Sequence, residues 1–281
     1  MPHLQCNRQF KSSSNLNMKK HKGNYILCLT YLLGFLMVCC MDVSAQKKTL
    51  NDSLHHVQMS LAAEVQKLMN DALYNEALII LEPEIKKHAI QDSVRELLEV
   101  LYIRTLKAAG KSDSSVRAAK NWARREPYAI KPHLELYDIY YERGDYYNAA
   151  HQLELILMRK PGDVMLICQA AMLYMHSEEL IKGEQLSNLG MERAEKAREK
   201  AAARSSRAMV FLKKKEYDKA IYIAKEAVAE DITYPESFYI LGVAYARIGR
   251  QDLVCQPLRN AIELKGGPWC QDFYETKCMG R

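Results

Sequence analysis

The tripeptide Gly110-Lys111-Ser112 matches the end of a loop that cradles nucleotide phosphates. That loop needs a second glycine five residues before Gly110, because its backbone N–H groups must form an open nest around the phosphates. Thr105 occupies that position, inside a segment with helical periodicity. The sequence therefore predicts an ordinary turn, with Ser112 or Asp113 capping the helix that follows.

Other arrangements of catalytic residues are absent from the sequence. There is no Gly-x-Ser-x-Gly nucleophile turn, no His-Glu-x-x-His zinc helix and no Gly-x-Gly-x-x-Gly phosphate loop. His55 and His56 are neighbours, but adjacent residues of a helix point about 100° apart. The pair Glu178 and Glu179 lies where a turn is expected and favours an exposed loop. We therefore expect no enzymatic activity, no cofactor and no bound metal.

The eight cysteines do not form a pattern typical of a metal site or a disulfide scaffold. Four of them lie in or before an apolar N-terminal segment, and the others are Cys168, Cys255, Cys270 and Cys278. These four include no Cys-x-x-Cys pair and no histidine at ligand spacing, which argues against structural zinc. Cys270 and Cys278 would either join in an oxidising compartment or remain unpaired thiols on a terminal helix.

The positive net charge is concentrated near the N-terminus. The formal charge is +6, yet residues 1–49 carry seven Lys or Arg against one acid, Asp42, and the other 33 basic and 33 acidic residues cancel. Binding to nucleic acid requires clustered basic side chains that displace counterions from phosphates. We therefore expect no nucleic-acid partner.

Residues 18–45 have the parts of a secretory signal peptide. A basic start is followed by the apolar run 25–41, and Val43-Ser44-Ala45 predicts cleavage before Gln46. Retention of the run as a membrane anchor is the alternative, since 17 residues is the short limit for a spanning helix. A lipoprotein signal fits poorly, because large residues precede the cysteines of the run. Residues 1–17 are interpreted as the product of an overlong gene start and residues 46–57 as a linker. The part of the chain after the apolar run is expected outside the cytoplasm, in the periplasm.

A helix-pair pattern recurs about every 34 residues and is clearest in Ile130–Asp163. Pro132 opens one helix, Gly144 ends it, Asp145 begins a second helix and Pro161 follows its end. Each helix is apolar on more than one side, so a lone hairpin would leave apolar surface in water and must be covered by neighbouring hairpins. The pattern therefore predicts a stack of helical hairpins.

The last full unit, Pro235–Pro268, follows the same plan around Gly242. A residue without a side chain lets the two helices of the hairpin approach closely, and we expect a small residue opposite it on the second helix.

These units resemble tetratricopeptide repeats, whose pattern is a large apolar residue, Leu-Gly, Tyr, then Ala, an aromatic, Ala and Pro. The resemblance covers 58–268. It is strong for the units beginning at residues 130, 201 and 235 and weaker for those beginning at 58, 96 and 164. It implies an all-α fold, an α-solenoid of about six repeats, with residues 269–281 as a capping helix and tail. Three departures are expected: a kink or early helix end at Pro83, Glu178 in place of a turn glycine, and a second helix about three residues longer in the unit from residue 164.

In such repeats the first helices line a concave face along which protein or peptide partners bind. Carried over position by position, the resemblance places these residues in the groove: Lys131, Leu134, Asp138, Tyr141, Met165, Cys168, Met172, Met175, Met209, Leu212, Tyr239 and Val243. The methionines would form either an adaptable apolar groove or interhelical core. The family's clamp for acidic C-terminal tails is not expected, because its Lys, Asn and Arg positions carry other residues, such as Leu134 and Asp138.

The resulting hypothesis is an exported scaffold that binds protein or peptide segments for a cell-envelope or secretion assembly. The alternative is a membrane-anchored regulatory subunit that recruits an envelope enzyme. The two differ in whether the mature chain begins at Gln46.

Overall fold

The structure is a computed structural model that describes residues 60–87 and 93–280. Within these ranges the chain forms helices and turns but no strand. The predictions for the leader at 1–45, its apolar run and the linker at 46–57 lie outside the described residues. No helix within the described ranges is long and apolar enough to cross a membrane.

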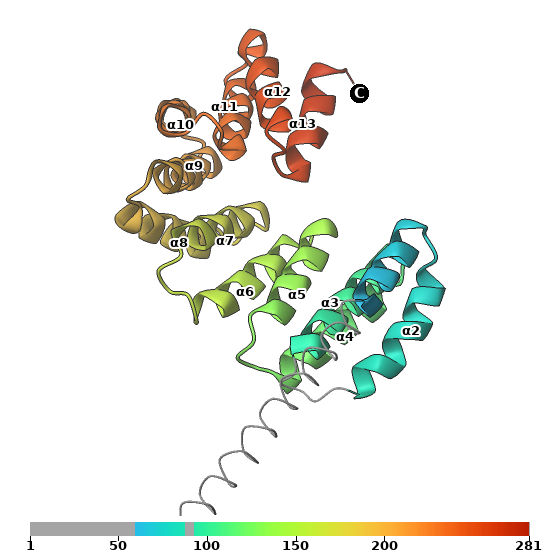
Figure 1. Cartoon of the computed structure of the whole chain (residues 1–281). Helices are drawn as coiled ribbons and strands as arrows, with labels where there is room; N and C mark the ends of the chain where they lie inside the picture. The colour runs from blue at the N-terminus through green and yellow to red at the C-terminus, as the bar shows by residue number, and fades with distance from the viewer. Residues whose placement is uncertain (1–59, 88–92, 281) are drawn as a thin grey trace, which may run out of the picture. The chain divides into compact units, whose positions relative to one another are not determined.

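The helices follow one another as hairpin pairs, as Figure 1 shows. A helix over residues 60–70 precedes α2. The following elements are α2 (Tyr74–Lys87), α3 (Ser93–Ala108), α4 (Ser112–Arg125), α5 (Lys131–Glu142), α6 (Tyr146–Leu157), α7 (Val164–His176), α8 (Leu180–Arg193), α9 (Ala197–Lys213), α10 (Tyr217–Glu230), α11 (Pro235–Arg247), the short η1 (Gln251–Leu253), α12 (Cys255–Glu263) and α13 (Pro268–Cys278). The expected all-α solenoid of six helix pairs with a closing helix is confirmed.

One residue with a left-handed backbone joins the two helices of each middle pair. Gly110 and Gly144 have φ near +70°, and Glu178, 34 residues further, adopts φ +65°. A side chain makes this conformation unfavourable, so the turn at Glu178 is held by the helices on either side of it. The predicted replacement of a turn glycine by Glu178 is thus present in the structure.

The predicted lengthening of the second helix after residue 164 is wrong. That helix, α8, ends at Arg193, and three residues separate it from α9. The additional residues lengthen α9 instead, which has 17 residues where α5 has 12. The carboxylate of Glu199 accepts hydrogen bonds from the backbone N–H groups of Glu195 and Lys196, and these bonds stabilise the earlier helix start.

Of the two alternatives expected at Pro83, a kink or an early helix end, the early end is wrong, because α2 continues through it to Lys87. A proline removes the hydrogen bond to the carbonyl four residues earlier, here that of Ile79. The side chain of Ile79 is 72% exposed, so that turn of the helix faces water, which can hydrate the free carbonyl.

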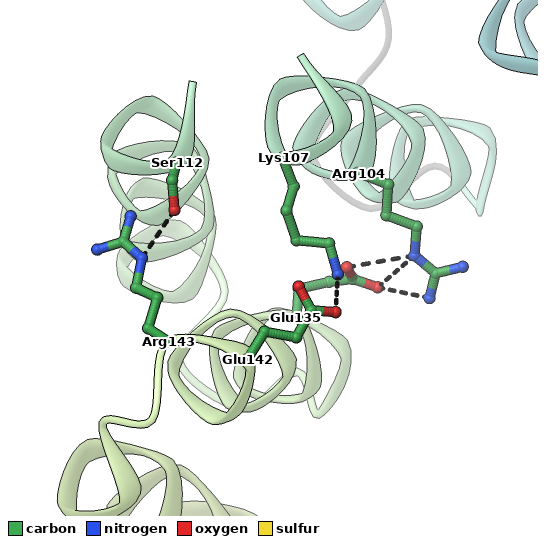
Figure 2. A network of polar contacts seen from close by, with 6 residues as sticks. All are labelled: Arg104, Lys107, Ser112, Glu135, Glu142 and Arg143. Carbon is green, nitrogen blue, oxygen red and sulfur yellow. Dashed lines mark hydrogen bonds and ion pairs between the residues drawn. The ribbon is translucent and has the colours of Figure 1, made fainter. Parts of the chain in front are cut away.

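Ser112 and Asp113 do not cap α4, contrary to the prediction. The residue at the cap position is Lys111, which makes no side-chain capping bond. Instead, Arg143 at the end of α5 donates from Nε to Ser112 Oγ at 2.7 Å, as Figure 2 shows, and from Nη2 to Asp113 at 3.2 Å. The two side chains connect neighbouring repeats rather than a helix end.

Gly242 brings α11 and α12 together as predicted. A Cβ built at Gly242 would lie 2.7 Å from the Leu258 side chain and 3.3 Å from the carbonyl of Val254. The residue opposite is the large, fully buried Leu258 and not the small residue that was expected. Gly242 therefore makes space for a leucine of the second helix.

A disulfide between Cys255 and Cys278 links α12 to α13. Both expectations for Cys278 are therefore wrong, since it neither pairs with Cys270 nor remains free. Cys270 lies on the buried side of α13 and is a free thiol, as is Cys168. The bond encloses the α12–α13 hairpin and ties the end of α13 to the start of α12.

Candidate functional site

Of the predicted groove residues on α5, Lys131 forms an ion pair with α3, and two other residues of α5 form further pairs with that helix. Lys131 pairs with Glu96 at 3.1 Å, and Arg104 makes a two-pronged contact with Glu135, with Nη2 and Oε1 2.8 Å apart. Lys107 and Glu142 form a third pair between these helices, and Figure 2 shows the latter two pairs side by side. These ion pairs join α3 to α5 and neutralise this face.

Among the predicted groove residues of α5, Leu134 is exposed and Asp138 and Tyr141 are half-buried. Burial raises the pKa of Asp138, and the neighbouring Glu135 raises it further, while Lys107 and Arg104 oppose the shift. Asp138 therefore lies among charges that already balance one another.

Three predicted groove residues of α7 are buried between helices. Cys168, Met172 and Met175 are at most 3% exposed, whereas Met165 is half-buried. A Cβ at Gly183 of α8 would lie 2.7 Å from Cε of Met175, so this methionine packs into the space that the glycine leaves. For Met172 and Met175 the structure favours the core interpretation over the adaptable groove.

The other predicted residues meet at a cavity of about 310 Å³ that is lined by α7, α9 and α11. Its apolar wall is formed by Met209 and Leu212 of α9 and by Tyr239 and Val243 of α11. We call it the α9–α11 cavity. Four members of the predicted row therefore lie together around one hollow.

The rim of the α9–α11 cavity is positively charged. Lys213, Lys215 and Arg247 lie on it, with Glu178 as the acidic member. Glu178 accepts a hydrogen bond from Lys213 at 2.5 Å, whereas Lys215 and Arg247 have no carboxylate partner within the described part of the chain. An apolar wall with two unneutralised cations fits a ligand that carries both an apolar group and a negative charge.

An aromatic pocket adjoins this cavity. The ring of Trp269 from α13 stacks on His176 with centroids 4.3 Å apart and planes inclined by 21°. Tyr141 and Tyr146 meet it edge-on at 5.6 and 5.5 Å, and Tyr239 lies at 6.3 Å. We call the space enclosed by these four residues around the indole the Trp269 pocket, and it shares His176 and Tyr239 with the α9–α11 cavity.

His176 is neutral in this environment. Burial lowers its pKa from 6.5 to about 4, and the positive charge of Lys213 lowers it further, whereas Glu178 acts in the opposite direction. Within the described residues, His176 Nε2 and Trp269 Nε1 are both buried without a hydrogen-bond partner. Each such unsatisfied polar atom costs about 1–3 kcal/mol.

The sequence interpretation did not include the residues that complete this site. His176 is not among the predicted groove positions, and Trp269 falls in the segment 269–281 that is expected to form a capping helix and tail. Lys213, Lys215 and Arg247 lie at or just beyond the ends of first helices, where a search for groove positions inside each helix does not find them. Their shared position at the ends of α9 and α11 was the available signal.

A second cavity of about 520 Å³ lies on the second helices, between α6 and α8. Its wall includes Leu155, Met158, Leu186 and Leu189. Arg193 at its edge donates a hydrogen bond to the carbonyl of Pro161. It contains none of the predicted groove residues. Within the described residues no group of His, Cys, Asp or Glu could hold a metal ion.

No protein-family model matches this sequence, and no curated protein matches it either. Among solved structures, a tetratricopeptide repeat protein from Parabacteroides merdae ATCC 43184 resembles the chain with a TM-score of 0.58 at 14% identity, over 78% of this chain and 86% of that one. The described part of the chain has the tetratricopeptide-repeat fold. A weaker similarity is to YrrB, a TPR protein with an unusual peptide-binding site, with a TM-score of 0.42 at 14% identity over 70% of this chain and 97% of that one. Another is to the Cut9–Hcn1 hetero-tetramer of the APC/C, with a TM-score of 0.47 at 13% identity over 79% of this chain and 43% of that one.

Proposed function

We propose that this tetratricopeptide-repeat chain is an exported scaffold that holds a protein partner through the α9–α11 cavity. The observation that carries the proposal is the combination of an apolar wall from two successive first helices with the free cations Lys215 and Arg247 on its rim. Peptide segments bind in hollows of this kind by placing an apolar side chain inside and a charge at the edge.

Two features support the exported location. The leader at 18–45 has the order of parts of a signal peptide. The Cys255–Cys278 disulfide is typical of proteins in oxidising compartments, because thiol pools of the cytosol keep such cysteines reduced. An envelope or secretion assembly in the periplasm is therefore the setting that we propose for the partner.

Charge reversal at the rim tests the binding site. The double variant Lys215→Glu/Arg247→Glu should retain its helical circular dichroism but lose the proteins that the wild type captures from an envelope extract, identified by mass spectrometry. Lys67→Glu/Lys160→Glu is the matched control, because it changes the net charge equally at two exposed lysines away from the cavity. Equal capture by both double variants would contradict the proposed site.

The location has its own test. The chain is expressed in a bacterium with two membranes, its periplasmic fraction is collected, and the N-terminus of the recovered protein is sequenced. We expect Gln46 as the first residue. Recovery of the intact apolar run in the inner-membrane fraction would favour the alternative, a membrane-anchored regulatory subunit.

A further inference from the structure

The start of the C-terminal helix α13 contacts the middle repeats, chiefly through the side chain of Trp269. The backbone of α13 packs against α12, and the helix pairs in close backbone contact do not include α13 with α5, α6 or α7. Trp269 nevertheless touches Tyr141, Tyr146 and His176 of those helices or their ends. Besides the helix packing that runs through α9, the start of α13 therefore meets the middle repeats through the indole of Trp269 and through Gly267, where a Cβ would lie 2.6 Å from Oη of Tyr141.

The Trp269 pocket is a site that fits an aromatic side chain. Aromatic rings at centroid distances of 4.5–7 Å gain roughly 0.5–1.5 kcal/mol per pair beyond the area they bury. Three tyrosines surround Trp269 at such distances and His176 stacks on it at 4.3 Å, and all four residues lie outside the α12–α13 hairpin. Its occupation by Trp269 demonstrates the fit to an indole.

The fit leaves polar groups unsatisfied. Trp269 Nε1 is buried without an acceptor, and His176 Nε2 lies beside it without a partner. A core side chain in a permanent position normally has such groups paired. An incoming segment with backbone carbonyls and N–H groups of its own would satisfy both atoms of the pocket.

The pocket and the α9–α11 cavity form one continuous surface. His176 lines the cavity and stacks on Trp269, and Tyr239 contributes to both. A segment bound in the cavity with its negative charge near Lys215 and Arg247 therefore meets His176 and Tyr239, the two wall residues against which Trp269 packs. Either the segment ends there, or its next aromatic side chain takes the place of the indole.

We infer that the Trp269 pocket is the binding site for an aromatic side chain of an acidic partner segment, and that Trp269 is an internal competitor which fills it in the free protein. This inference rests on the proposed function, since the same segment occupies the α9–α11 cavity. Only molecules in which the pocket is open can bind the aromatic side chain, so the apparent affinity for the segment is the intrinsic affinity multiplied by the open fraction. Removal of the competitor should therefore tighten binding.

The first experiment uses a synthetic acidic peptide with a single tryptophan, and a control peptide with alanine in its place. Calorimetric titration should show that the tryptophan peptide binds Trp269→Ala at least about tenfold more tightly than it binds the wild type, as removal of a competitor requires. The alanine peptide should bind both proteins equally. N-acetyl-tryptophanamide alone should bind Trp269→Ala and not the wild type at the same concentration.

Equal affinity of the tryptophan peptide for both proteins, or no binding of it to a folded Trp269→Ala, overturns the inference. The charge-reversal experiment above still decides the proposed function, because it changes the rim and leaves the pocket intact. Circular dichroism and melting of Trp269→Ala show whether that variant is folded.

A measurement on the unmodified sequence covers the case in which the variant does not fold. The chain contains two tryptophans, Trp269 and the fully buried Trp122, so 5-fluorotryptophan labelling gives two ¹⁹F resonances. Saturation with the tryptophan peptide should move the Trp269 resonance toward the position of a solvent-exposed indole and leave that of Trp122 unchanged. A Trp269 resonance that stays at its buried position while the peptide binds refutes the competition.

Discussion

Acidification should destabilise the C-terminal half of this protein through His176. The imidazole lies between the indole of Trp269 and the wall of the α9–α11 cavity, where burial and Lys213 lower its pKa from 6.5 to about 4. In the unfolded chain the pKa of the same side chain has its ordinary value of about 6.5. The two states therefore differ in bound protons between these two pH values.

The sign and size follow from this difference. Between pH 6.5 and about 4 the unfolded chain binds a proton that folded His176 does not, so the free energy of unfolding falls as the pH falls. The contribution is fully present above pH 6.5. A shift of one pKa unit corresponds to about 1.4 kcal/mol, so the whole shift is worth about 3 kcal/mol, of which about 2 kcal/mol is lost between pH 7 and pH 4.5.

The assay is urea denaturation of the wild type and of His176→Phe at both pH values, followed by circular dichroism. Phenylalanine preserves a ring against Trp269 but cannot be protonated. Other groups respond to pH as well, and burial raises the pKa values of Glu99 and Glu236, which favours the folded state on acidification. These groups are present in both proteins, so their effects cancel in the comparison. The wild type should lose about 2 kcal/mol more than the variant does.

An equal response of the two proteins would refute the reasoning. So would a His176 proton resonance that titrates near pH 6.5 in the folded wild type, because the imidazole would then be accessible to water and not enclosed by Trp269. In Trp269→Ala, where water reaches the ring, the His176 pKa should rise and the pH effect should shrink.

Three further changes test other parts of the structure. Cys255→Ser opens a disulfide with a sequence separation of 23 residues, and chain entropy predicts a loss of about 3 kcal/mol by thermal melting, which addition of a dithiol to the wild type should reproduce. Arg104 and Glu135 form a bidentate ion pair with one buried partner, so a double-mutant cycle should give a coupling energy of about 1–2 kcal/mol. A coupling energy near zero would show that this ion pair does not stabilise the packing of α3 against α5. Gly242→Ala should lower the free energy of unfolding by about 1–2 kcal/mol, because the clash with Leu258 outweighs the gain in helix propensity of about 1 kcal/mol. The control Gly162→Ala, which has free space around the new methyl group, should be nearly neutral.

The helix pairs could be predicted because their signals are local. Gly110, Gly144 and Gly249 mark turns that require a left-handed backbone, and each acts within a few residues of its own position. At Pro83, where a kink or an early end was expected, the early end is wrong, because packing of the apolar face carries α2 on to Lys87. Local reasoning also failed at the α8–α9 junction, where the additional residues of the repeat lengthen α9 and not α8.

The site was predicted only in part. Met209, Leu212, Tyr239 and Val243 follow from the repeat period and do line the cavity. The period cannot distinguish them from Met172 and Met175, which hold equivalent positions and are similarly buried but do not line the cavity. Contact with the cavity depends on what lies opposite a residue, and one repeat unit does not contain that information.

The sequence alone was sufficient for the helical repeats, their turns and the balance of charge, because these depend on backbone preferences and on composition over short stretches of chain. Only the tertiary structure shows which cysteine pairs with Cys278 and that Met175 lies in the core. It also shows that Trp269 packs against Tyr141, Tyr146 and His176. Each of these depends on side chains from helices that are far apart in sequence and meet only when the repeats pack together.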